Sequence, residues 1–222
     1  MLSSPVLVLS ILLLPASYTT WYPTDLDIYV PLHTFHYLTW LLNNHGYSSV
    51  SEGAVNHLTY SYSKIASIYT FSNGVCMMDV IISKTSAAFS PLFQFHSTAL
   101  MNFVSHDQIF CVYPSLTLHH LSLINPGLLY ANCFSDKHID ALQKYVLHGF
   151  KHVCCANVHD RGGYCRSKCH SITDTDCLWI NTQSLPQACT LLGHIFLQYS
   201  IVNVNWLLGG RVCSSAGGFL WP

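Results

Sequence analysis

Residues 23–30 read Pro23-Thr-Asp-Leu-Asp-Ile-Tyr-Val30, an alternating apolar run that opens with two aspartates and is followed by Pro31. The alternation predicts a β-strand that ends at the proline, and side chains two positions apart on a strand point to the same face. Asp25 and Asp27 would therefore lie side by side. Neighbouring carboxylates repel each other unless solvent screens them or a cation neutralises them. This stretch is thus a candidate for cation binding.

A third aspartate lies in a predicted hairpin. The apolar runs 65–72 and 75–83 flank Asn73-Gly74, the strongest signal for a two-residue turn. Both faces of the second run are apolar, which indicates a central strand covered on both sides. Asp79 lies inside that run, where a charge without a partner is costly. Three acids on adjacent strands would form a platform for divalent cations, the basis of two-metal phosphoryl and nucleotidyl transfer.

Ordinary roles remain open for the same three residues. Asp25 follows Pro23-Thr24, a position where aspartate is common in turns, and Asp27 could be an exposed strand residue. Asp79 could be paired with Lys64 or Lys84.

The rest of the chain mixes helices and strands. We expect helices over 32–44, stopped by Asn44-His45-Gly46, over 90–104 and over 136–150. The segment 118–130 is expected to be helical in part, with an interruption at Asn125-Pro126-Gly127. Short strands are expected over 47–50 and 109–113. This order predicts an α/β or α+β class, with a small mixed sheet that carries the acidic strand and the hairpin and is flanked by helices.

Composition limits the functional classes. The chain has 222 residues, enough for one domain with a core and a small appendage, and only 9% of them are charged, with a formal net charge of −1. This balance leaves no basic face for duplex nucleic acid. The apolar stretch 188–208 contains His194, Gln198, Asn203 and Asn205, so we expect no membrane span there.

The apolar N-terminal stretch permits two interpretations. Its length suits a signal peptide, but no basic residue precedes it and no small-x-small cleavage site follows. We therefore expect a buried helix with Ser3 or Ser4 as its N-cap, Pro5 in the first turn and Pro15 at its end, and an intracellular protein. Secretion of a small cysteine-rich protein is the alternative.

Half of the ten cysteines lie between Cys154 and Cys177, together with several histidines. Thiolate and imidazole are the ligands that zinc prefers. The short loops between four of these side chains could wrap one structural ion, which gives the candidate set Cys155, His159, Cys165 and Cys169. Cys154, His170 and Cys177 are possible replacements. Reduced thiols, or one or two disulfides in a secreted protein, are the alternatives.

Several of these segments together carry a resemblance. The acidic run 25–31, the hairpin segment 78–85, the stretches 93–103 and 109–114 and the Cys/His segment resemble the polymerase-β-type nucleotidyltransferase fold, and more closely an uncharacterised fungal group with that fold. The similarity covers roughly residues 15–177. It implies that Asp25 and Asp27 bridge two Mg²⁺ or Mn²⁺ ions, that Asp79 is the third ligand, and that a nucleoside triphosphate is the partner.

The chain departs from that family at its start. The family holds phosphate with a Gly-Ser or Gly-Gly pair at a helix N-terminus, where backbone amides suit the task. Here Ser3 and Ser4 are the only substitutes, and the preceding strand is absent. The resemblance therefore predicts an N-terminally truncated nucleotidyltransferase-like domain over 1–150 with impaired catalysis. A zinc-binding segment over 151–180 and an apolar segment over 181–222 would follow.

Two other functions remain open on the sequence. One is a non-catalytic binding or scaffold protein that keeps the fold and a zinc-stapled loop. The other is the small secreted cysteine-rich protein with a cleaved leader.

Overall fold

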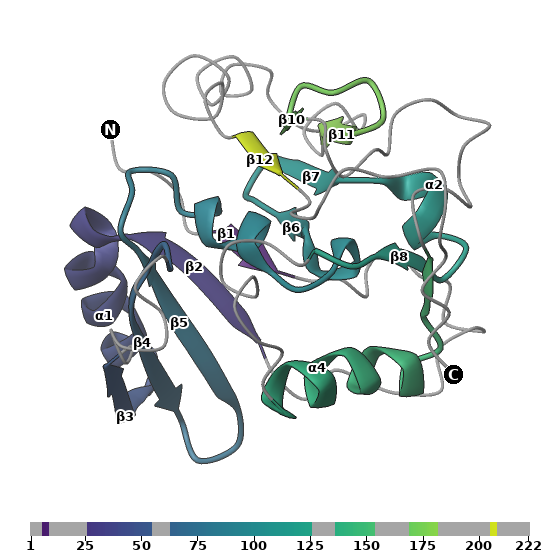
Figure 1. The fold of residues 1–222 in the computed structure, drawn as a ribbon. Helices are drawn as coiled ribbons and strands as arrows, with labels where there is room; N and C mark the ends of the chain where they lie inside the picture. Colours follow the sequence, from purple (N-terminus) through teal and green to yellow (C-terminus); the bar gives the residue numbers. More distant parts are fainter. Residues whose placement is uncertain are drawn as a thin grey trace.

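The computed structural model describes residues 6–8, 26–54, 63–125, 136–153, 169–181 and 205–207. It has a mixed α+β fold, as predicted, in which an eight-stranded sheet is accompanied by short helices (Figure 1). The strands of this sheet are β1 (Val6–Val8), β2 (Asp27–Pro31), β3 (Ser48–Ala54), β4 (Ile65–Ser72), β5 (Met77–Ser83), β6 (Asn102–Val104), β7 (Gln108–Cys111) and β11 (Leu178–Asn181).

The helices and the small sheets complete the described fold. The α-helices are α1 (Phe35–Asn44), α2 (Pro114–Thr117) and α4 (Asp136–Leu147), and the 3-10 helices are η2 (Leu32–Thr34), η3 (Ser90–Gln94) and η4 (Thr98–Leu100). Strand β8 (Leu121–Leu123) pairs in parallel with β9 (Lys151–Val153), and β10 (Cys169–Ser171) pairs antiparallel with β12 (Asn205–Leu207).

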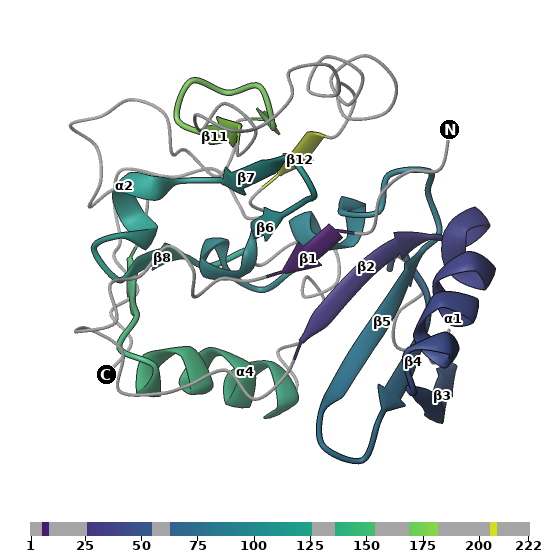
Figure 2. The same cartoon turned by 180° about the vertical axis from the view of Figure 1, so that it is seen from behind.

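The strand order of the large sheet is β11-β7-β6-β1-β2-β5-β4-β3. Its pair β2–β5 is parallel, and the other described neighbours are antiparallel. Figure 2 shows β1 from behind, between β2 and β6. A parallel pair needs a long crossover rather than a tight turn, and here the crossover contains α1 and the hairpin strands β3 and β4.

The sheet buries apolar side chains on both faces because the residues of β2 and β5 alternate between them. On one face Val30, Val80 and Ile82 pack against Leu38 and Leu42 of α1. On the opposite face, Tyr29 of β2 and Ile81 of β5 pack into a larger core. Residues of η3, β6, β7 and α2 complete that core. The prediction that 75–83 forms a central, doubly covered strand is confirmed for β5.

Two helix predictions are confirmed. The segment 32–44 forms η2 and then α1, and Gly46 follows with a φ of 82°. Residues 136–147 form α4, and Gly149 follows with a φ of 89°. In both places glycine supplies the left-handed conformation that commonly ends a helix.

The hairpin was predicted correctly, but its turn is longer than expected. Ser72 pairs with Met77, so four residues rather than two connect β4 to β5. The cause is the Asn73 side chain, whose Oδ1 accepts hydrogen bonds from the amides of Val75 at 3.0 Å and Cys76 at 2.8 Å. A side chain that bonds nearby amides stabilises a wider turn.

Two helix predictions were wrong, and a third is tested only in part. Val6–Val8 forms strand β1 rather than part of a buried helix, because a short apolar run reads equally well as either and this one is paired with β2 and β6. The expected helix over 90–104 is broken into η3 and η4 and ends in β6. In the segment 118–130, residues 121–123 form β8, which pairs with β9, and residues 126–130 lie outside the described ranges.

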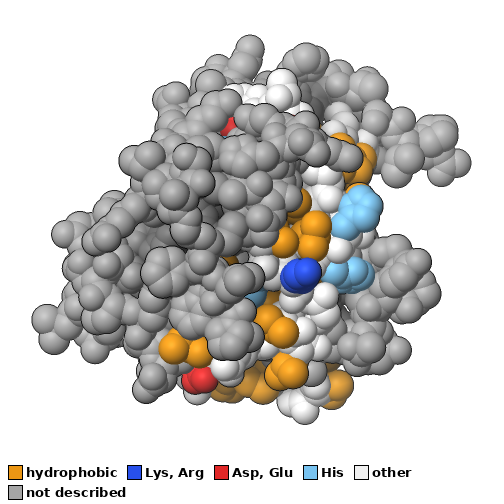
Figure 3. All heavy atoms as spheres, turned by 45° about the vertical axis from the view of Figure 1, so that its right-hand side comes forward, with side chains coloured by type: hydrophobic (Ala, Val, Ile, Leu, Met, Phe, Trp, Pro, Cys, Tyr) orange, Lys and Arg blue, Asp and Glu red, His pale blue; other side chains and the backbone are white. Residues whose placement is uncertain are grey.

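Charged side chains are sparse on the face shown in Figure 3, where the described surface is mainly hydrophobic, histidine and neutral polar. Within the described ranges, no helix combines the length and the hydropathy needed to cross a bilayer.

Candidate functional site

The parallel pairing of β2 and β5 brings two of the predicted acids together. Asp27 and Asp79 are register partners on these adjacent strands. Register partners project to the same face of a sheet, and adjacent strands lie about 4.8 Å apart. The two carboxylates are therefore neighbours, although 52 positions separate them in the sequence, from 27 to 79.

The acid pair belongs to a polar row that runs across four strands. Thr70 of β4 is opposite Asp79, and Ser51 of β3 is opposite Thr70. The Thr70 hydroxyl donates a hydrogen bond of 2.7 Å to Oδ1 of Asp79. Two residues further along these strands, the same face carries the apolar side chains of Ile68 on β4 and Ile81 on β5, which belong to the larger core. The polar row thus lies at the border of the apolar core.

Backbone pairing fixes the position of Asp79. Its amide donates a hydrogen bond of 2.8 Å to the carbonyl of Leu26. Strands β4 and β2 flank β5 on its two sides, so the main chain at Asp79 is held from both directions. The carboxylate is half-buried, and its Cα has little freedom to move away from Asp27.

Two tyrosines adjoin the acids. Tyr29, two residues after Asp27 on β2, is fully buried, and burial followed by the charge of Asp27 raises its pKa well above the ordinary value. Burial, and then the charge of Asp27, also raises the pKa of Tyr145 on α4. Both phenols stay protonated near neutral pH, so they add no negative charge beside the carboxylates.

The donor chemistry of the acid pair suits a hard divalent cation. Carboxylate oxygens are preferred ligands of Mg²⁺, which commonly binds through one or two carboxylates, substrate phosphates and water. The alternative partners Lys64 and Lys84 form no ion pair with Asp79 in the described part of the chain. The residue types of the two acids thus suit a divalent cation.

Several predicted site residues fall outside the described ranges. These are the third acid, Asp25, the phosphate-turn substitutes Ser3 and Ser4, and the zinc candidates Cys155, His159 and Cys165. The backbone of Cys169 lies in β10. Among the described residues, no group of three or more His, Cys, Asp or Glu side chains is arranged to hold a metal.

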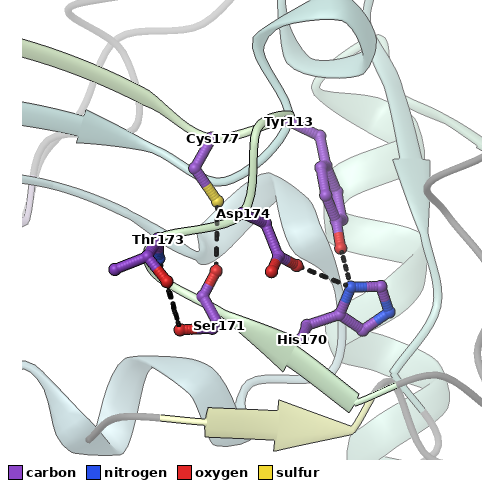
Figure 4. A network of polar contacts seen from close by, with 6 residues as sticks. All are labelled: Tyr113, His170, Ser171, Thr173, Asp174 and Cys177. Carbon is purple, nitrogen blue, oxygen red and sulfur yellow. Dashed lines mark hydrogen bonds and ion pairs between the residues drawn. The ribbon is translucent and has the colours of Figure 1, made fainter. Parts of the chain in front are cut away.

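The described end of the Cys/His segment forms a hydrogen-bonded cluster (Figure 4). His170 is fully buried, and its Nδ1 lies 2.7 Å from the hydroxyl of Tyr113 and 3.3 Å from Oδ2 of Asp174. Cys177 Sγ donates to the carbonyl of Ser171 at 3.6 Å. Two of the three possible replacement ligands, His170 and Cys177, thus make protein contacts that attach this segment to the core, and the third, Cys154, lies outside the described residues. Zinc binding by the other residues stays a prediction.

Sequence reasoning missed Thr70, Tyr113 and Asp174 as partners. Tyr113 is 57 positions from His170, and no local pattern links the two. For Thr70, the predicted two-residue turn at Asn73-Gly74 would put Ile68 opposite Asp79, and only the wider turn of the structure brings Thr70 to that position.

Comparisons of the chain with protein-family models, with curated proteins and with solved structures find no match.

Proposed function

We propose that the chain is a divergent nucleotidyltransferase-like protein that binds a divalent cation at Asp27 and Asp79 and, through that cation, a nucleoside triphosphate. The observation that carries the proposal is the in-register pairing of these two acids on adjacent parallel strands. The carboxylates hold Mg²⁺ or Mn²⁺, with Asp25 as a further ligand. Catalysis is weak, because Ser3 and Ser4 substitute poorly for a phosphate-holding glycine pair.

The described residues would divide the task. Asp27 and Asp79 supply negative oxygens, and Tyr29 and Tyr145 border them with neutral phenols, which keeps the net charge of the site suited to one or two divalent cations. When bound, such a cation neutralises phosphate charge and activates an attacking hydroxyl. The acids hold and orient the cation, and the apolar core behind them limits the access of water from that side.

The test is cation-dependent nucleotide binding by the full-length chain. We expect Mn²⁺ or Mg²⁺ to raise the melting temperature, and ATP, GTP, CTP or UTP to raise it further only with the cation present. A ligand at 100 times its Kd stabilises the folded state by about 2.7 kcal/mol, which is readily measured. Asp27→Asn and Asp79→Asn should each remove the effect.

Asp140→Asn is the matched control, because Asp140 is an exposed acid on α4 that lies outside the polar row. It should keep the full cation response. A folded wild-type protein with no cation response, or an unchanged response in Asp79→Asn, would contradict the proposal. Cation binding without any nucleotide response would leave a metal-binding scaffold, and would reject the nucleotidyltransferase-like function.

A further inference from the structure

Within the acid pair, the carboxylate of Asp79 is held in place by a side-chain partner. Thr70 lies directly opposite Asp79 in the antiparallel β4–β5 pair and donates its hydroxyl hydrogen to Oδ1 of that carboxylate at 2.7 Å. The distance of 2.7 Å is typical of a well-formed hydrogen bond from a hydroxyl donor. Such a bond is stronger when its acceptor is an ionised carboxylate.

We propose that Thr70 is a positioning residue for the cation site, which it serves by fixing the orientation of the Asp79 carboxylate. This inference rests on the proposed function, since it takes the same acid pair as its target. The Thr70 hydroxyl occupies Oδ1, and the other oxygen, Oδ2, is assigned to the cation. One carboxylate thus has its two oxygens divided between an orienting donor and a metal.

Sheet geometry makes Thr70 suited to this task. Strand β5 has β4 on one side and β2 on the other, so Asp79 has the Thr70 donor on one flank and the Asp27 carboxylate on the other. Threonine is stiff at χ1 because it is β-branched, and its hydroxyl is therefore presented at small entropic cost. A serine could make the same bond with more rotational freedom.

The consequence is a specific dependence of metal affinity on one hydroxyl. Ligating carboxylates are in turn hydrogen-bonded by surrounding groups, and loss of such a partner typically costs 10-fold to 100-fold in metal affinity. An ordinary structural role for Thr70 predicts something else: a β-branched residue that fits the strand would be replaceable by valine without effect on metal binding.

Valine and serine variants separate the two roles. Thr70→Val keeps the shape and the strand preference but removes the donor, whereas Thr70→Ser keeps the donor and removes a methyl group. Mn²⁺ affinity of the full-length chain is measured from the electron paramagnetic resonance signal of free Mn²⁺. We expect Thr70→Val to weaken Mn²⁺ binding about 10-fold to 100-fold and Thr70→Ser to stay within about 3-fold of wild type.

Ser51→Ala is the matched control. Ser51 lies in the same polar row, on the far side of Thr70 from the acids, and it is exposed. Its removal should leave Mn²⁺ affinity unchanged. Melting of the cation-free proteins, followed by circular dichroism, checks that each variant is folded.

The outcomes distinguish this inference from the function on which it rests. If wild type binds Mn²⁺ and folded Thr70→Val binds it equally well, the positioning role is wrong while the cation site stands. If valine and serine variants weaken binding equally, side-chain packing rather than the donor is responsible, and the positioning role is again wrong. If wild type does not bind Mn²⁺, the cation site itself is overturned, and the role of Thr70 falls with it.

Discussion

At the scale of single residues, the acid pair lowers the stability of the cation-free fold, because the like charges of Asp27 and Asp79 repel each other. Like charges on paired positions of adjacent strands are destabilising, and solvent reduces their repulsion at a half-buried site. Thr70 offsets part of the cost through its hydrogen bond to Asp79.

Removal of one charge should therefore stabilise the cation-free protein. Asp79→Asn abolishes the repulsion with Asp27, and the amide Oδ1 can still accept the Thr70 hydrogen bond. We expect the free energy of unfolding in urea, measured with a chelator present, to rise by about 1 kcal/mol. The same variant loses the stabilisation by Mn²⁺. A lower stability in the chelator would indicate that the fold already balances the Asp79 charge.

At the scale of elements, local signals could be predicted and non-local pairing could not. Periodicity together with Gly46 identified α1, and Asn73-Gly74 located the β4–β5 hairpin. The pairing of Asp27 with Asp79 was beyond reach, because a parallel pair has no connecting turn to fix its register. The sequence suggested only that the acids lie on neighbouring strands. Val6–Val8 was misread because a three-residue strand carries no periodicity.

The β4–β5 turn should depend on one side-chain oxygen. Asn73→Ala leaves the amides of Val75 and Cys76 without their protein acceptor, although water can reach them at this exposed turn. We expect a loss of about 1 kcal/mol in the free energy of unfolding by urea. Asn73→Asp keeps the acceptor oxygen and should stay near wild type. Equal losses in both variants would show that the acceptor is not what stabilises the turn.

At the scale of the whole molecule, the large sheet joins two cores into one cooperative unit. Strands β2 and β5 contribute Val30 and Val80 to the core beneath α1, and Tyr29 and Ile81 to the larger core on the opposite face. Because the same two strands cover both cores, unfolding of β2 and β5 would expose the apolar side chains of both cores together. The acid pair lies on β2 and β5, which pack against a core on each face of the sheet, and this packing gives the site a rigid base.

Stability should fall as the solution becomes mildly acidic. Burial lowers the pKa of His152, and burial together with Lys144 lowers the pKa of His148. His152 connects strand β8 to helix α4, with Nδ1 2.8 Å from the Ser122 hydroxyl and Nε2 3.2 Å from the Leu142 carbonyl. Both imidazoles stay neutral in the folded chain at a pH where they are already protonated in the unfolded chain.

The unfolded state therefore binds more protons below its ordinary histidine pKa of about 6.5, and the stability present above that pH is lost as the pH falls. The measurement is urea unfolding at pH 7.5, 6.5 and 5.5. His152→Gln should show a shallower loss of stability with falling pH than wild type. An equally steep loss would place the sensitivity elsewhere among the fourteen histidines.

The central place of β1 also governs how the chain can assemble during translation. Strand β1 pairs on one side with β2, soon after it in the sequence, and on the other with Val104 of β6. About 70 residues separate the end of β2 from Val104, and their synthesis takes roughly 4 to 15 s at usual elongation rates. Strands β2 to β5 can pair in that time, while the second edge of Val6–Val8 still lacks its partner. An unpaired strand edge on the ribosome is a template for pairing with other chains, so this strand order carries an aggregation hazard until β6 has emerged.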